Sequence, residues 1–170
     1  MASTVNVLTN VPAVGTSRPP LILDGNYLPA GSARTLTYAD NRATVLLDTV
    51  TGSTVTLPAA TGSGVRFRFL VSVIATSNSH IVKVANAADT MQGVINTTLV
   101  GTPTTNNGWV PVTTGAVGGR GDTITLNRGT TGSATVGEWF DVEDIATATW
   151  QVNGQTTEVG AAATPFSATV

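Results

Sequence analysis

The densest group of residues suited to acid–base or metal chemistry lies in the segment GEWFDVED, residues 137–144. It contains four carboxylates: Glu138, Asp141, Glu143 and Asp144. Side chains alternate between the two faces of a strand, so Asp141 and Glu143 are expected on the face that carries Trp139. Glu138 is expected on the opposite face. A carboxylate pair can hydrolyse glycosidic bonds or bind calcium. We favour a structural interpretation, in which these charges lie on a solvent-facing strand edge and discourage unwanted sheet pairing.

The other titratable residues form no second group. His80 is the one histidine, and in the segment SNSHIVKV we expect a solvated polar residue before a strand, not a catalytic base. The chain has no cysteine, so the common zinc sites cannot be assembled. Asp24 and Asp89 lie beside turn residues, where capping and turn roles are commoner than catalysis. We therefore predict no catalytic residue, no metal site, no cofactor and no enzymatic activity.

A glycine-rich segment, GAVGGRGD at residues 115–122, is predicted to be a flexible loop. It lacks the Lys-Ser/Thr ending of a phosphate-binding loop, and no helical pattern follows it. Arg120-Gly121-Asp122 is the tripeptide by which some proteins engage integrins. Because a three-residue match often arises by chance among such residue types, we interpret it as loop sequence.

Three tryptophans, Trp109, Trp139 and Trp150, leave a carbohydrate-binding role open. Exposed aromatic rings on a β-sandwich can stack against sugars. Trp150 alternates with Val152, however, and this pattern is more typical of a core or a subunit interface. Glycan binding is therefore an alternative expectation.

The composition favours strands. Thr occurs 31 times and Val 22 times, and β-branched residues suit a pleated sheet. Only 11% of the residues are charged, against roughly 25% in typical soluble domains. The formal net charge of −2 gives no basic footprint for nucleic acid. The N-terminal sequence lacks the pattern of a signal peptide, and no apolar run approaches the roughly 18 residues of a membrane helix. We expect neither nucleic acid nor a membrane as a partner.

Period-two alternation from Thr35 onward predicts an all-β fold. The clearest strand is VRFRFLVSV, in which the apolar residues at 65, 67, 69, 71 and 73 share one face. Asn153-Gly154 is among the predicted turns, and residues 144–149 are predicted to connect a hairpin. Short strands at spacings of about 8–12 residues point to a β-sandwich or jelly-roll-like domain. No longer repeat is visible, which argues against a solenoid or propeller. Further strands are expected at 52–58, 80–85, 93–100, 108–114, 122–128, 136–143 and 147–154.

Residues 1–34 differ from the rest of the chain because several prolines make a helix improbable there. They also hold two short apolar patches, at residues 5–8 and 21–23. We predict that residues 1–34 form an extended N-terminal arm that orders on a neighbouring subunit, with a flexible tail as the alternative. Residues 35–170 are predicted to form the β-sandwich domain.

Residues 34–98 contain GSTVTLPAATGSGVRFRFLVSV and then SNSHIVKVANAADTMQGVI. This succession of a TLP-type strand, a Gly-rich turn, an aromatic-alternating strand and an I-K-V-A-like strand resembles a recurring pattern in tailed-bacteriophage structural proteins. The segments GGRGDTITLNRGTTG, GEWFDVEDIATATWQVNG and the terminal ATPF also look like this group. Together these matches cover about two-thirds of the chain.

Proteins of this kind are similar to capsid decoration, or cement, proteins. The resemblance implies a β-sandwich, often a homotrimer, that binds the major capsid protein lattice and stabilises the capsid. The expected location is the capsid surface of the virion, after synthesis in the bacterial cytoplasm. The resemblance supplies no catalytic residues. The alternative is a phage fibre or spike component that contacts the host surface through glycans. A third hypothesis is a glycan-active enzyme that uses the carboxylates of residues 138–144.

Overall fold

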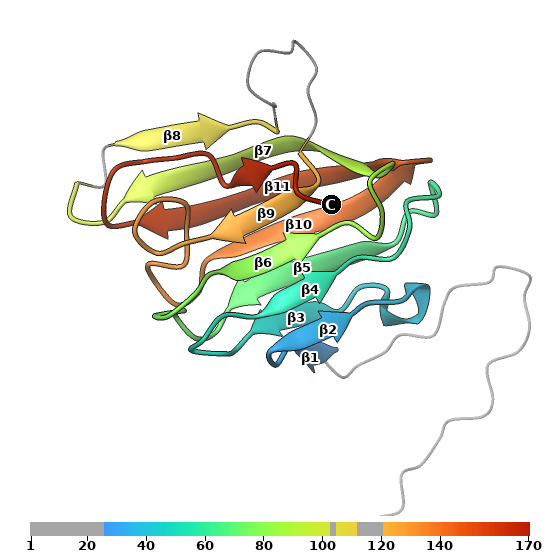
Figure 1. Cartoon of the computed structure of the whole chain (residues 1–170), viewed down its shortest axis with the longest axis horizontal. Helices are drawn as coiled ribbons and strands as arrows, with labels where there is room; N and C mark the ends of the chain where they lie inside the picture. Colours follow the sequence, from blue (N-terminus) through green and yellow to red (C-terminus); the bar gives the residue numbers. More distant parts are fainter. Residues whose placement is uncertain (1–25, 103–104, 112–120) are drawn as a thin grey trace, which may run out of the picture.

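The computed structural model describes residues 26–102, 105–111 and 121–170. In this part of the chain, twelve strands form two sheets, and the predicted all-β sandwich is confirmed (Figure 1). The larger sheet has the order β1 (Tyr27–Pro29), β3 (Thr44–Leu47), β5 (Arg66–Val71), β10 (Trp139–Ala146), β11 (Thr149–Glu158), β7 (Thr90–Leu99) and β8 (Asn106–Trp109). The smaller sheet has the order β12 (Phe166–Ser167), β9 (Thr123–Leu126), β6 (His80–Lys83), β4 (Thr54–Thr56) and β2 (Ala33–Thr35). The one helical element among the described residues is a 3₁₀ turn at Tyr38–Asp40, and none there is long and apolar enough to span a membrane.

Both sheets mix parallel and antiparallel pairing. In the larger sheet β1, β3 and β5 run parallel, and in the smaller sheet β2, β4 and β6 do the same. From β1 to β6 the chain passes from one sheet to the other and back with each strand. We call this winding of six strands the two-sheet coil; it is coloured blue to green in Figure 1. The sequence argued against a solenoid, and the fold as a whole is a sandwich, but within it residues 27–83 wind between the two sheets in this parallel manner. Pairing joins Tyr27 to Thr44 but Thr44 to Arg68, so the coil has an uneven period that leaves no repeat.

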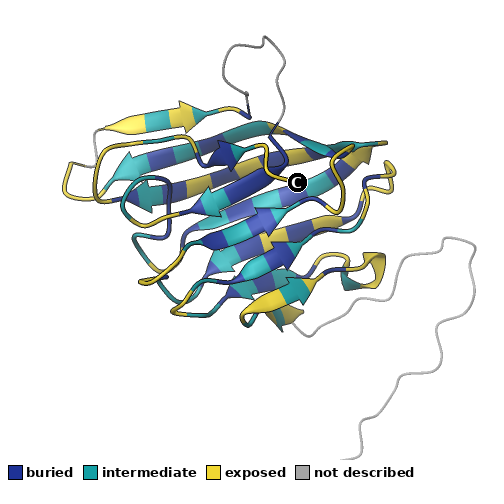
Figure 2. Ribbon diagram, viewed as in Figure 1, coloured by how far each residue is buried: buried dark blue, intermediate teal, exposed yellow. Residues whose placement is uncertain are grey.

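The apolar face of β5 meets β10 and β11 in the centre of the core. Phe67 and Phe69 are fully buried. Figure 2 shows that buried and more exposed residues alternate along the central strands. The ring of Phe69 stacks on Phe140 with centroids 4.9 Å apart, and the ring of Phe67 lies 6.2 Å from Trp150. The predicted apolar face of residues 65–73 is buried at 65, 67, 69 and 71 and half buried at 73. Aromatic packing therefore joins the three central strands.

The predicted turn at Asn153-Gly154 is wrong, because both residues lie within β11. Gly154 is directly opposite Phe140, and a Cβ at this position would lie only 2.3 Å from the Cβ of Phe140. Glycine is required here by close packing, not by a turn. The predicted hairpin connection at residues 144–149 is confirmed, since β10 and β11 pair up to Ala146 and Thr149.

The sandwich begins before residue 35. β1 pairs with β3 and β2 pairs with β4, so these two strands belong to the two sheets, although residues 1–34 were assigned to the arm from the sequence. The apolar patches at 5–8 and 21–23 lie outside the described residues, as do residues 112–114 of the strand expected at 108–114.

Replacing Phe67 tests the assignment of the core. Phe67→Ala removes a fully buried ring, and we expect the free energy of unfolding to fall by about 3–5 kcal/mol. The matched control is Leu70→Ala on the same strand, whose side chain is half buried on the outer face, and it should cost less than about 1.5 kcal/mol. Urea unfolding of both variants measures the difference. Equal losses would contradict the assignment of Phe67 to the core.

Candidate functional site

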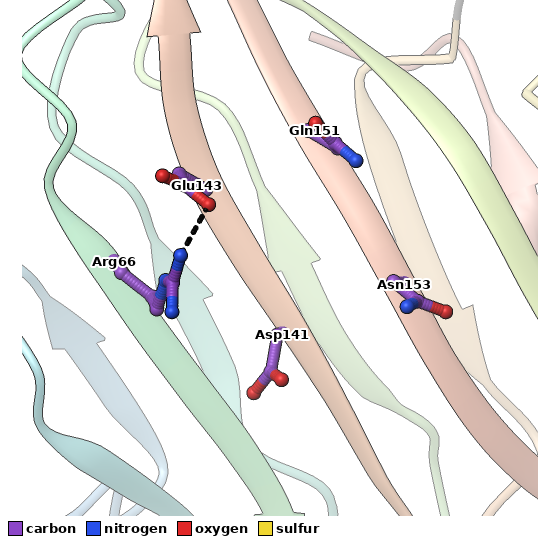
Figure 3. A pocket seen from close by; sticks show the side chains of 5 residues that line it. All are labelled: Arg66, Asp141, Glu143, Gln151 and Asn153. Carbon is purple, nitrogen blue, oxygen red and sulfur yellow. Dashed lines mark hydrogen bonds and ion pairs between the residues drawn. The ribbon is translucent and has the colours of Figure 1, made fainter.

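The outer face of the larger sheet carries charged pairs between β5 and β10. The register places Glu143 opposite Arg66 and Asp141 opposite Arg68. Arg66 Nη2 donates to Glu143 Oε2 at 2.7 Å (Figure 3). Arg68 holds both carboxylate oxygens of Asp141, at 2.7 and 2.8 Å. We use the term polar face for seven outward side chains of the three central strands: Arg66, Arg68, Trp139, Asp141, Glu143, Gln151 and Asn153.

The predicted alternation along residues 138–144 agrees with the structure. Trp139, Asp141 and Glu143 share the polar face, and Glu138 is buried on the other side. The predicted strand edge is wrong, because β10 lies between β5 and β11 inside the sheet. Here the charges pair with arginines of the neighbouring strand instead of repelling foreign strands. Both outward carboxylates are engaged by a guanidinium group, as in a structural ion pair.

Asp144 is fully buried at the far end of β10 and binds the loop that precedes β5. Its carboxylate accepts hydrogen bonds from the backbone N–H groups of Thr61, Gly62 and Ser63, at distances between 2.7 and 3.1 Å. The hydroxyl of Ser63 adds another bond at 2.7 Å. Burial raises the pKa of Asp144, but the hydrogen bonds from Ser63, Thr61 and Gly62 outweigh it, so the pKa lies below its usual value. Asp144 is therefore a structural anchor.

Glu138 has the corresponding role just before β10. Its carboxylate accepts hydrogen bonds from the backbone N–H groups of Ser133 at 2.6 Å and Thr135 at 2.7 Å. The hydroxyl of Thr157 on β11 also donates to it. Of the four clustered carboxylates, two are thus buried loop anchors and two are outward ion pairs. The structure does not bring the four together into one site.

Two open hollows lie beside the outward side chains of β10. The first, of about 180 Å³, is lined by Arg66, Asp141, Glu143, Gln151 and Asn153 (Figure 3). The second, of about 240 Å³, is lined by Trp139 and Gln155 together with residues of the neighbouring strands and of the 135–138 segment. Each is smaller than the roughly 300–1,000 Å³ typical of small-molecule pockets. This geometry suits surface contact rather than enclosure of a substrate.

The prediction that His80 is solvated is wrong, because its side chain is fully buried. Nδ1 accepts a hydrogen bond from the backbone N–H of Ser53 at 3.0 Å. Nε2 lies 2.8 Å from the carbonyl oxygen of Val73 and donates to it. The imidazole is therefore neutral, with its proton on Nε2, and it joins two loops. Burial lowers its pKa, against smaller raising contributions from Val73 and from the charges of Asp48 and Glu138.

The remaining predicted residues also have structural roles where they are described. Asp89 accepts hydrogen bonds from Ala60 N and Asn86 Nδ2, which confirms a turn role. Asp122 of the Arg-Gly-Asp tripeptide is buried and accepts bonds from the backbone N–H groups of Thr169 and Val170. Its carboxylate is therefore occupied, which argues against integrin contact. Asp24 and Arg120 lie outside the described residues.

The tryptophans differ in their surroundings. Trp150 is fully buried, so of the two predicted settings, core or subunit interface, it occupies the core; Trp109 packs partly buried against the core. Trp139 is half buried on the polar face, and the guanidinium carbon of Arg68 lies 4.7 Å from its ring centroid. Sequence alternation indicated the outward direction of Arg68 and Trp139. It carried no signal that they would meet across two strands.

Within residues 26–102, 105–111 and 121–170, no three His, Asp or Glu side chains come together as a metal site would require. Comparison with known proteins gives no match to a family model, a curated protein or a solved structure. The functional argument therefore rests on the residues and their geometry.

The anchor formed by Asp144 can be tested by Asp144→Asn. The amide would place donors against backbone N–H groups, and we expect a loss of about 3 kcal/mol in the free energy of unfolding. Since the pKa of Asp144 is lowered in the fold, its contribution is present above about pH 3.9 and is lost as the pH falls through the folded-state value. The variant should lack this part of the acid dependence.

Asp141→Asn is the matched control for Asp144→Asn. It breaks an exposed ion pair on the same strand, which is worth less than about 1 kcal/mol. Denaturant unfolding at neutral pH and near pH 3 measures both variants. Equal destabilisation by the two would contradict the anchor.

His80 can be observed directly, because it is the one histidine of the chain. We expect its imidazole resonance in NMR spectra to titrate with a midpoint below the usual value of about 6.5. The unfolded chain then binds the proton at higher pH, so stability is full above about pH 6.5 and falls as the pH drops toward the folded-state midpoint. A midpoint at or above 6.5 would contradict the buried neutral imidazole.

Unfolding measurements of this effect should use the Glu158→Gln background. Burial raises the pKa of Glu158, so its contribution changes with pH in the opposite direction. Removing that carboxylate leaves the slope from His80 visible.

Proposed function

We propose that this chain is a non-enzymatic structural protein of a tailed-bacteriophage particle, which decorates the capsid by binding the major capsid protein lattice. The resemblance of residues 34–98 and of the later strands to phage structural proteins supports the proposal. The observation that carries it further is the outer edge of β2, which no described strand occupies and where a strand from another subunit can add. The proposed location is the capsid surface.

The edges of β1 and β2 lie at the same end of the sandwich, and no described strand pairs with the outer side of either (Figure 1). The edge of β1 is blocked, because Pro29 has no N–H and its carbonyl oxygen accepts a bond from Arg34 Nε at 2.6 Å. On β2, Thr54 N donates to Ser32 and Leu36 N donates to Thr56. Even-numbered residues of this stretch therefore pair with β4.

Backbone groups alternate in direction along a parallel strand, so the N–H groups of Ala33 and Thr35 point away from β4. They form an open edge that a strand from a neighbouring subunit can extend. Such pairing supplies affinity through the backbone and needs no special side chain. Repeated around a homotrimer on the capsid lattice, several weak contacts of this kind would add by multivalency. This is the mechanism that we propose for decoration.

A second candidate is a fibre or spike component that contacts the host surface. The open polar face favours it, because its hollows are accessible and are not used for packing in the described residues. The two candidates differ in their partner, since a fibre component has no reason to bind assembled capsids.

The test is co-sedimentation of the purified protein with capsids of the same phage that lack it. We expect binding to saturate at a fixed number of copies per capsid and to raise the melting temperature of the capsid. Removing residues 1–25 keeps every described strand, so the variant should unfold like the full chain. It should attach more weakly, because it lacks most of the arm that we predict to order on a neighbouring subunit. Absence of saturable binding would overturn decoration and favour the fibre component.

A pair of substitutions at one position tests the β2 edge in the same assay. Thr35→Pro removes an outward N–H and should weaken attachment about fivefold, the equivalent of one hydrogen bond of about 1 kcal/mol. Thr35→Ala keeps the N–H and should bind as the unchanged protein does. Equal binding of the two variants would reject the β2 edge as the contact.

A further inference from the structure

The polar face contains side-chain amides with no partner in the described structure. Gln151 and Asn153 on β11 are exposed, and their amides make no side-chain hydrogen bond to another described residue. They stand on the neighbouring strand beside Asp141 and Glu143 (Figure 3). Each amide presents a donor and an acceptor side by side. These groups are therefore free to bind a ligand without breaking the fold.

The two hollows follow the same pair of strands. The register places Glu143 opposite Gln151, Asp141 opposite Asn153 and Trp139 opposite Gln155. The first hollow lies at the Glu143 end of this ladder, and the second lies at the Trp139 end. Because successive outward residues are about 6.6–6.8 Å apart along a strand, the ladder forms an extended strip. A linear ligand with repeating units fits this shape better than a compact one.

The chemistry of the strip matches sugar hydroxyl groups. Planar amide, carboxylate and guanidinium groups can each bind two neighbouring hydroxyls at once. Arg66 and Arg68 balance Asp141 and Glu143, so the strip has no net formal charge. This balance favours an uncharged ligand over an acidic or basic one.

Trp139 supplies an apolar surface at one end of the strip. Its ring is held by Arg68, whose guanidinium lies over it and is itself fixed by both oxygens of Asp141. The ring also lines the second hollow. Because Arg68 covers one face of the ring, the part of Trp139 that lines the second hollow is the apolar surface against which the C–H groups of a sugar can pack.

We propose that the polar face binds an uncharged polysaccharide chain laid along β10 and β11. This site is distinct from the β2 edge, and glycan binding by the chain itself does not depend on capsid decoration. Only its role as a second attachment of the particle, to a glycan surface, rests on the proposed function.

The experiment is native electrophoresis of the full chain in gels that contain dextran, galactomannan or mixed-linkage β-glucan. We expect retardation by at least one of these, increasing with polysaccharide concentration. The double variant Gln151→Ala/Asn153→Ala should raise the apparent dissociation constant about tenfold, because two ligand hydrogen bonds are lost. Its melting temperature should not change, since neither amide has a described partner. Thr56→Ala, on the outer face of the smaller sheet, is the matched control and should bind normally.

Binding can also be followed by tryptophan fluorescence. The signal change on adding the retarding polysaccharide should disappear in Trp139→Phe, whereas Trp109 and Trp150 remain as internal references. The proposal is overturned if none of the three polysaccharides retards the protein. It is also overturned if the double variant binds as the unchanged chain does, or if only an acidic polysaccharide such as alginate binds.

Discussion

The register of β10 between β5 and β11 is the constraint on which both faces of the larger sheet depend. Directly opposite residues on neighbouring strands point to the same side of the sheet. One register therefore stacks Phe140 against Phe69 on the inner face and pairs Asp141 with Arg68 on the outer face. A slip of one residue would exchange the two faces and bury the charges. The inner aromatic contacts and the outer ion pairs therefore support the same alignment.

Two buried carboxylates fix this alignment at the ends of β10. Glu138 holds the 133–135 loop just before the strand, and Asp144 holds the 61–63 loop near its end. Charge-assisted bonds to backbone N–H groups are among the stronger interactions of a folded chain, and their loss leaves a buried charge without partners. The strand is thus positioned by its ends as well as by its neighbours. This explains how a chain with few charged residues uses several of them inside.

The sequence predicted which side chains share a face of a strand, because this depends on local alternation. It did not predict the roles of residues whose hydrogen-bond partners are distant in the chain. The faces of residues 65–71 and the division of Trp139 and Asp141 from Glu138 follow from period two alone. The role of Asp144 depends on Thr61–Ser63, and that of His80 on Ser53 and Val73, which only the fold brings close. Asn153-Gly154 has the composition of a turn, but glycine is required at residue 154 because Phe140 packs directly against it. The parallel coil escaped detection because its connections differ in length. Of the candidate site, alternation indicated the outward arginines and carboxylates but not their pairing across strands.

The buried carboxylates stabilise the fold, whereas the exposed carboxylates contribute little to stability and can serve in recognition. Exposed ion pairs such as Arg66–Glu143 contribute about 0–1 kcal/mol, because water screens them and long side chains lose freedom on pairing. Buried anchors such as Asp144 contribute several times more. The polar face can therefore exchange its internal partners for those of a ligand at small cost to the fold. A mutation that alters the outer face should leave the aromatic core and the loop anchors intact. The same sandwich can thus present a different outer surface, provided that the register of β10 and its two buried anchors are kept.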